Sequence, residues 1–194
     1  MVIKDFPAEG WVRSNSAVDE SSIKEIARLQ KMNQDLQAKI DRISTEPPKG
    51  SDILCQGEDL FDLGINFEAT QKRTYRSFNC SAQVSTTWNR IFKKIAPFMI
   101  NECTDSSLRA ALDGFSESFK KQISSMKEFS DLLEFENFEV STETYNQIKV
   151  QLRALGLIEI SSKKHSTTDK STYWTLTQYG DYVMTQLVAL RKEN

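Results

Sequence analysis

Residues 141–160, STETYNQIKVQLRALGLIEI, decide how the C-terminal half of the chain folds. Ser141 or Thr142 can begin a helix, because a side-chain hydroxyl accepts a hydrogen bond from an otherwise unpaired N–H of the first turn. Apolar side chains then recur at helical spacing, at Tyr145, Ile148, Leu152 and Leu155. Gly156 is placed to end the helix, and residues 157–160 predict a short strand.

A polar loop and a returning strand follow this segment. Residues 161–172 include Lys163, Lys164, His165 and Lys170, and residues 173–177, YWTLT, predict the second strand. Thr177 can cap a last helix. This order of helix, strand, polar loop, strand and helix resembles a winged-helix domain, in which the loop between the two strands is the wing.

Two alternating segments nearer the N-terminus predict an antiparallel hairpin with one apolar face. Residues 60–70 place apolar side chains at every second position, at Phe61, Leu63, Ile65, Phe67 and Ala69. Residues 77–84 do the same at Phe78, Cys80, Ala82 and Val84. The apolar position of Cys80 favours a small buried side chain over a reactive thiol.

The region between the hairpin and residue 141 gives a mixed signal. A helix capped by Thr87 should end near Pro97, because proline removes a backbone donor and clashes with the preceding turn. A second helix can begin at Asp105 or Ser106. Residues 122–139 fit either the continuation of an apolar helical stripe or a packed loop.

Residues 22–43 carry the pattern of a coiled coil. One seam position of the heptad holds an asparagine between two isoleucines, and the other holds apolar residues alone, so that the seam reads Ile26, Leu29, Asn33, Leu36, Ile40 and Ile43. A buried asparagine at such a site fixes register and favours a parallel dimer. The pattern spans three heptads, which is short, and an amphipathic helix packed on its own domain is the alternative.

These segments together predict a helix-rich α+β chain. It consists of an N-terminal coiled-coil helix, a β-hairpin and a winged-helix-like C-terminal domain. The expected boundaries are a tail or linker at 1–21, the coiled-coil helix at 22–46, a linker rich in Pro, Gly and Ser at 47–58, and the hairpin with the winged-helix-like domain at 59–194.

Composition argues against an enzyme. The net charge of −2 does not suit strong nucleic-acid binding by the whole chain, and the single histidine excludes a two-histidine metal site. The seven glycines form no phosphate loop, and three widely spaced cysteines argue against a disulfide framework. We therefore expect no catalytic residues, metal or cofactor. No apolar run approaches membrane-spanning length and the N-terminus lacks a signal sequence, so we expect a cytoplasmic chain without membrane insertion.

Most of the chain from about residue 8 also resembles one bacterial family. The resemblance is to the C-terminal region of proteins in domain-of-unknown-function family four-zero-six-two. It is carried by residues 10–13, the heptad helix that follows them, and residues 87–92, 95–100, 150–158, 173–177, 179–181 and 184–187. In that family a TIR-like or nucleoside-deoxyribosyltransferase-like domain precedes this region. That domain is absent here, so no catalytic residue is carried over, and the chain resembles the C-terminal half of a bacterial signalling or defence protein.

Two functions follow as hypotheses. The first is a non-catalytic module that forms a homodimer through residues 22–43 and binds a protein partner or an effector domain. The alternative is a winged-helix DNA-binding regulator that contacts DNA through residues of the 142–155 helix and the loop after it, at Asn146, Gln147, Lys149, Arg153, Lys163, Lys164 and Lys170. Residues 141–194 hold seven Lys or Arg against five Asp or Glu, a net charge of +2 that supports DNA binding weakly.

Overall fold

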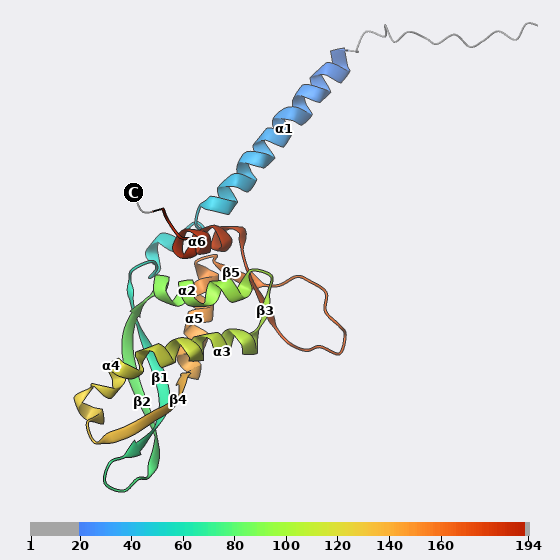
Figure 1. Cartoon of the computed structure of the whole chain (residues 1–194). Coiled ribbons are helices and arrows are strands. Elements are labelled where there is room, and N and C mark those ends of the chain that lie inside the picture. The colour runs from blue at the N-terminus through green and yellow to red at the C-terminus, as the bar shows by residue number, and fades with distance from the viewer. Residues whose placement is uncertain (1–19, 193–194) are drawn as a thin grey trace, which may run out of the picture. The chain divides into compact units, whose positions relative to one another are not determined.

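The computed structural model describes residues 20–192 and divides the chain into two units, residues 1–42 and 43–194 (Figure 1). The expected tail at residues 1–21 and the family-like segment at residues 10–13 lie almost wholly outside the described residues. In the first unit, helix α1 runs Glu20–Thr45, so that its last three residues belong to the second unit. The helix at residues 22–46 is thus confirmed. It begins two residues early and ends just before Pro47 and Pro48, which cannot continue it.

The hairpin is confirmed and is part of a larger sheet. Strands β1 (Leu60–Gln71) and β2 (Ser77–Thr87) pair antiparallel in unbroken register from Leu60 opposite Thr87 to Thr70 opposite Ser77. The apolar positions expected on β1 are buried except Phe61, which is half-buried. On β2 the apolar face is buried only in part, since Phe78 near the turn is 46% exposed.

A third strand, β4 (Leu132–Val140), pairs with the other side of β1 and gives the order β2-β1-β4. Neither interpretation of residues 122–139 included it. Its register against β1 shifts twice, and Glu134 (φ 48°) and Asn137 (φ 54°) have left-handed backbone conformations at those shifts. These bulges break the two-residue period, so that the buried side chains Phe135, Phe138 and Val140 do not alternate regularly in the sequence.

Helices cover the apolar face of this sheet. Helix α2 (Trp88–Ile95) is capped by Thr87 as expected and passes into a 3-10 turn, Ala96–Met99, at Pro97. Helix α3 (Asp105–Ser116) is capped by Thr104 rather than by Asp105 or Ser106, because the Thr104 hydroxyl accepts from the Ser107 N–H at 3.1 Å. Shorter helical turns, Glu117–Phe119, α4 (Lys120–Ser124) and Lys127–Phe129, lead into β4.

The C-terminal segment forms a second small sheet. Helix α5 (Thr142–Ala154) is capped by Ser141 and is followed by β5 (Ile158–Ile160), β6 (Tyr173–Leu176) and α6 (Gln178–Val188). Strand β3 (Cys103–Thr104) pairs with β6, so the sheet order is β3-β6-β5. The sequence of elements α2, β3, α3, α5, β5 and β6 follows the winged-helix arrangement, with β4 inserted between its second and third helices. Figure 1 shows the loop between β5 and β6 standing out from the body.

The segment expected as a linker, residues 47–58, is instead part of the second unit and packs on its other elements. It contains a 3-10 turn, Ser51–Ile53, whose Ser51 is buried. The Gln151 amide of α5 donates to the Cys55 carbonyl at 2.6 Å. Pro48 lies so close to Gly156 (φ 66°) that a Cβ on Gly156 would clash with the proline ring. The boundary between the two units therefore lies before this segment, after Arg42.

Candidate functional site

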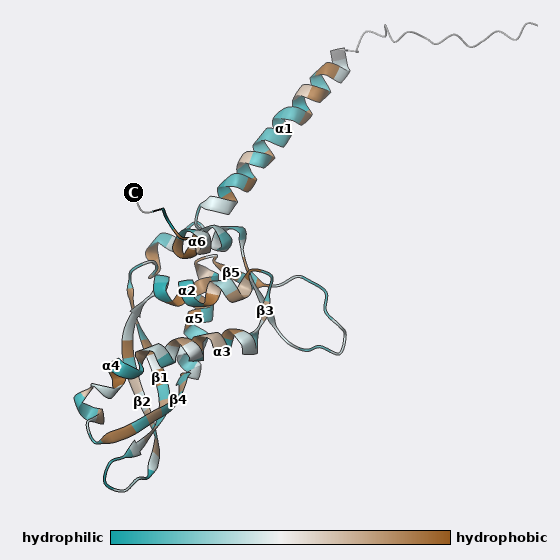
Figure 2. Cartoon of the chain, viewed as in Figure 1, coloured by the Kyte–Doolittle hydropathy of each residue, from teal (hydrophilic) through white to brown (hydrophobic). Residues whose placement is uncertain are grey.

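The apolar seam of α1 is the first candidate. Its five apolar side chains are each between 48% and 56% exposed, at Ile26, Leu29, Leu36, Ile40 and Ile43. Ile23 and Met32 flank the seam and are 54% and 51% exposed. Figure 2 shows the hydrophobic residues recurring along this helix between hydrophilic ones. A single helix leaves such a stripe in water, and burial of the stripe is the main source of free energy for helix association.

The polar residue of the seam lies at its middle. Asn33 is exposed, with two apolar seam positions on its N-terminal side and three on its C-terminal side. On the rest of the helix, Arg28 donates two hydrogen bonds of 2.8 Å to the Glu25 carboxylate, and Gln37 donates to Asp41 at 3.0 Å. These pairs lie outside the six seam positions, so that they support the helix without covering its apolar stripe.

The second candidate is the outer face of α5. Asn146 and Gln147 are exposed and line a hollow of about 620 Å³ together with Phe61, Trp88 and Glu143. Arg153 is exposed, and its guanidinium lies 5.9 Å from the Trp174 ring centroid. The carboxylate of Glu143 in this hollow is unfavourable for a phosphate backbone.

Lys149 does not lie on that face, contrary to the expectation for a DNA contact. Its ammonium lies 3.0 Å from Asp105 Oδ1 and 4.2 Å from the Tyr145 ring centroid, and its side chain is only 18% exposed. Trp174 Nε1 donates to the same carboxylate oxygen at 2.8 Å. Burial works to raise the pKa of the Asp105 carboxyl, but the hydrogen bonds from Lys149 and Trp174 hold that pKa below its ordinary value. The lysine therefore stabilises the junction of α3, α5 and β6.

The loop between β5 and β6 is tied to the body at its base. Lys163 Nζ donates to the Asn101 carbonyl at 3.0 Å. The His165 ring stacks on Tyr173 at 3.8 Å, and His165 Nε2 lies 3.6 Å from Glu102 Oε1. Lys164 and Lys170 are exposed, and they are the two loop lysines whose side chains have no partner within the described residues 20–192.

Two carboxylates lie close to the positively charged side chains of this loop. The Tyr173 hydroxyl donates to Asp169 Oδ2 at 2.6 Å and lowers the pKa of the Asp169 carboxyl to about 2. Glu102 accepts from the Ser161 hydroxyl at 2.5 Å and faces His165. Because both acids lie within the loop or at its base, the positive charge that the loop presents is reduced.

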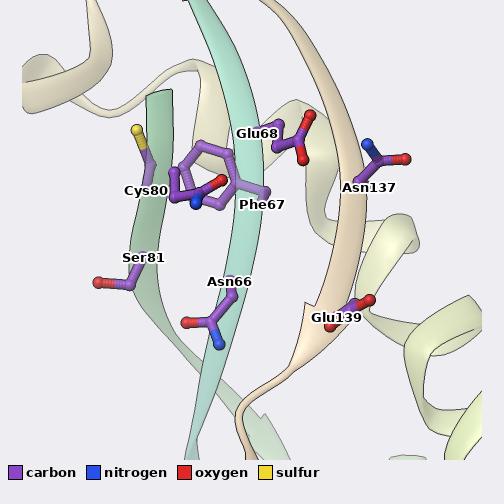
Figure 3. A pocket seen from close by; sticks show the side chains of 8 residues that line it. Asn66, Phe67, Glu68, Cys80, Ser81, Asn137 and Glu139 are labelled. Carbon is purple, nitrogen blue, oxygen red and sulfur yellow. The ribbon is translucent and has the colours of Figure 1, made fainter. Parts of the chain in front are cut away.

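The open face of the β2-β1-β4 sheet is polar and acidic. It holds a depression of about 450 Å³, lined by Asn66, Phe67, Glu68, Asn79, Cys80, Ser81, Asn137 and Glu139. Figure 3 labels seven of these side chains on strands β1, β2 and β4. Glu68 on β1 lies directly opposite Glu136 on β4, a like-charge pair that weakens strand pairing by itself. The depression is lined by two carboxylates and no cationic side chain, so it offers no complement to an anionic ligand.

The structure gives little support for a cysteine nucleophile. Burial raises the pKa of the Cys103 thiol to about 11 and raises the pKa of Cys80 as well. A high thiol pKa keeps the nucleophilic thiolate scarce at neutral pH. Across residues 20–192 no group of three or more His, Cys, Asp or Glu side chains could hold a metal ion.

No helix between residues 20 and 192 has both the length and the apolar content needed to cross a bilayer.

No protein-family model, no curated protein and no solved structure matches this chain. The function proposed for it therefore depends on the arrangement of the residues described above.

Proposed function

We propose that the chain is a non-catalytic oligomerisation and partner-binding module that forms a parallel homodimer through α1. The observation that carries the proposal is the apolar seam, in which Ile26, Leu29, Leu36, Ile40 and Ile43 are each about half exposed. Burying the remaining half of one such side chain contributes about 1 kcal/mol. Two copies bring ten of these side chains together, so the burial contributes about 10 kcal/mol in total. This exceeds the lower estimates of the cost of association, about 4 kcal/mol, by enough to favour a dimer at tens of micromolar.

The composition of the seam supports two parallel strands. Ile26 and Ile40 are β-branched residues at one seam position, and Leu29 and Leu36 occupy the other, which is the pairing that favours parallel dimers. In the parallel, in-register arrangement, Asn33 meets Asn33 of the second copy and the two amides can hydrogen-bond to each other. In an antiparallel arrangement with full overlap, Asn33 would face Leu36, and its amide would be buried without a partner.

Substitutions in the seam test the proposal. Leu29→Lys with Leu36→Lys places like charges in the interface, so light scattering should give a monomer at tens of micromolar where the parent gives a dimer. Gln34→Lys with Ala38→Lys adds the same charge on the opposite face and should leave the dimer intact. A parent that is monomeric, or a dimer that both pairs of substitutions leave unchanged, would refute the role of the seam.

The proposal also includes a binding partner other than a second copy of the chain. We infer that the second unit binds a protein partner or an effector domain in a bacterial signalling or defence protein, within the cytoplasm. The resemblance to domain-of-unknown-function family four-zero-six-two supports this inference, as do the low net charge and the scarcity of positive surface on α5.

A winged-helix DNA-binding regulator is the second candidate, favoured by the β3-β6-β5 strand order and by the exposed lysines of the protruding loop. If DNA binds, Lys164→Ala with Lys170→Ala, which removes the two loop lysines that have no partner among the described residues, should weaken binding equally across sequences and reduce the salt slope by about 2. Fluorescence anisotropy with random duplex DNA at several salt concentrations measures both. The absence of binding by the parent at low salt would rule this candidate out.

A further inference from the structure

The two edges of the β2-β1-β4 sheet are built differently. The β4 edge carries Glu134, Glu136 and Glu139 and two bulges, which are the features that keep an edge strand from pairing with another chain. Strand β2, Ser77–Thr87, contains no charged residue and no proline, and its register with β1 is unbroken over its whole length. One edge is thus protected against pairing, and the other is eleven residues of regular, uncharged strand.

Hydrogen bonds at the two ends of the hairpin show which backbone groups face outward. Gln71 N–H donates to the Arg76 carbonyl at 2.9 Å, and Trp88 N–H donates to the Asp59 carbonyl at 3.4 Å. Because hydrogen-bonded pairs alternate along an antiparallel ladder, the even-numbered residues of β2 bond to β1. The odd-numbered residues direct their N–H and C=O groups away from β1, at Ser77, Asn79, Ser81, Gln83 and Ser85.

These outward groups have no strand beside them. Among the strands that the structure describes, β2 is the last in its sheet, and its ladder pairs only with β1. Within residues 20–192 no turn or loop backbone hydrogen-bonds to Asn79, Ser81, Gln83 or Ser85. The side chains of these four residues are exposed on the polar face of the sheet.

We propose that this edge pairs antiparallel with β2 of a second copy, about a two-fold axis at Ala82, and joins the two sheets into one of six strands. Ala82 is the midpoint of Ser77–Thr87, so this register overlaps the full length of both strands. It places Ser81 opposite Gln83 of the second copy and Asn79 opposite Ser85. Each such pair exchanges two backbone hydrogen bonds.

A second copy fits this edge because a two-fold contact must be complementary to itself. A strand with a charged residue would bring like charges together in many of the registers available to it, whereas β2 brings none together in any register. On the other face of the sheet, the row of even-numbered β2 side chains also continues across the axis. It places Cys80 opposite Val84 and Phe78 opposite Thr86 of the second copy. Phe78, which is 46% exposed, would thereby gain cover at each end of the overlap.

Amide hydrogen exchange measured by NMR on the full-length chain tests the pairing residue by residue. The amides of Ser81 and Gln83 point outward, so pairing should slow their exchange by about ten-fold or more relative to a variant that cannot pair. Ser81→Lys with Gln83→Lys places lysines directly opposite each other across the axis and should abolish that protection. Asn66→Lys with Glu68→Gln makes the same charge change on the same face of the central strand β1 and should leave it unchanged.

The Leu29→Lys, Leu36→Lys variant, which should be monomeric at tens of micromolar, serves as a second control and should lose the protection. Protection that the Ser81 and Gln83 lysines remove, while light scattering still gives the α1 dimer, supports the pairing. Four results would overturn it: outward amides that exchange freely in the parent, protection that survives both lysines, protection in a chain that light scattering shows to be monomeric, or protection that arises only when an extended peptide is added.

Discussion

Replacing Asp105 should destabilise the second unit more than replacing the lysine that pairs with it. In Asp105→Ala the Trp174 indole N–H, on a side chain only 5% exposed, loses its acceptor, and Lys149 loses its counter-charge. A buried donor left without a partner costs about 1–3 kcal/mol. The ion pair itself adds less than about 1 kcal/mol, because the Asp105 side chain is 40% exposed.

We therefore expect Asp105→Ala to lower the free energy of unfolding by about 2–3 kcal/mol and Lys149→Met by about 1 kcal/mol. Asp105→Asn keeps an oxygen that accepts from the Trp174 N–H, so its loss of unfolding free energy should be close to that of Lys149→Met. Urea unfolding followed by far-UV circular dichroism measures all three. The double variant Asp105→Ala with Lys149→Met should cost less than the sum of the single changes, because the two residues share one interaction.

The pH dependence gives an independent check. The pKa of the Asp105 carboxyl is lower in the folded protein than in the unfolded chain, so its contribution to stability is present above the unfolded value, near pH 4. That contribution is lost as the pH falls through the folded value. The difference in stability between the parent and Asp105→Asn should accordingly shrink below pH 4. A cost for Asp105→Ala no larger than that for Lys149→Met, or a difference independent of pH, would refute this account.

Three further outcomes follow from single contacts. Gly180→Ala should cost at least about 3 kcal/mol, because the new Cβ would meet the Leu157 carbonyl oxygen, whereas Gly114→Ala, with open space around it in α3, should stabilise by about 0.5–1 kcal/mol in thermal unfolding. Asn33→Leu should raise the melting temperature of the α1 dimer and broaden its oligomer distribution in sedimentation velocity, since the residue that fixes register is lost. Cys103 should stay unmodified by a thiol reagent at pH 8 in the folded chain, as read by peptide mass spectrometry, because burial keeps its pKa near 11.

Elements with a strong local signal could be predicted from the sequence. Strand β1 has a clean two-residue alternation, and α5 and α6 have hydroxyl caps at Ser141 and Thr177, whose oxygens accept from the Thr144 and Gly180 N–H groups. Strand β4 has no such signal. Its left-handed residues Glu134 and Asn137 are tolerated because pairing with β1 and burial of the phenylalanines between and after them outweigh local preference.

In the candidate site, too, the positions of some residues could be predicted from the sequence and those of others could not. The exposure of Asn146, Gln147 and Arg153 follows from helical periodicity, since they lie opposite the apolar stripe of α5. The inward position of Lys149 could not be predicted, because its partner Asp105 is 44 residues away in the sequence and meets it only in the folded unit. The free edge of β2 was likewise hidden, since it depends on which side of β1 receives β4.

Sedimentation equilibrium of the full-length chain tests the central claim most directly. A parallel dimer through α1 predicts a mass of twice the 22.2 kDa chain at tens of micromolar, falling toward the monomer on dilution. The same experiment on the Leu29→Lys, Leu36→Lys variant should give 22.2 kDa where the parent is dimeric. A parent chain that stays at 22.2 kDa across this range would contradict the account.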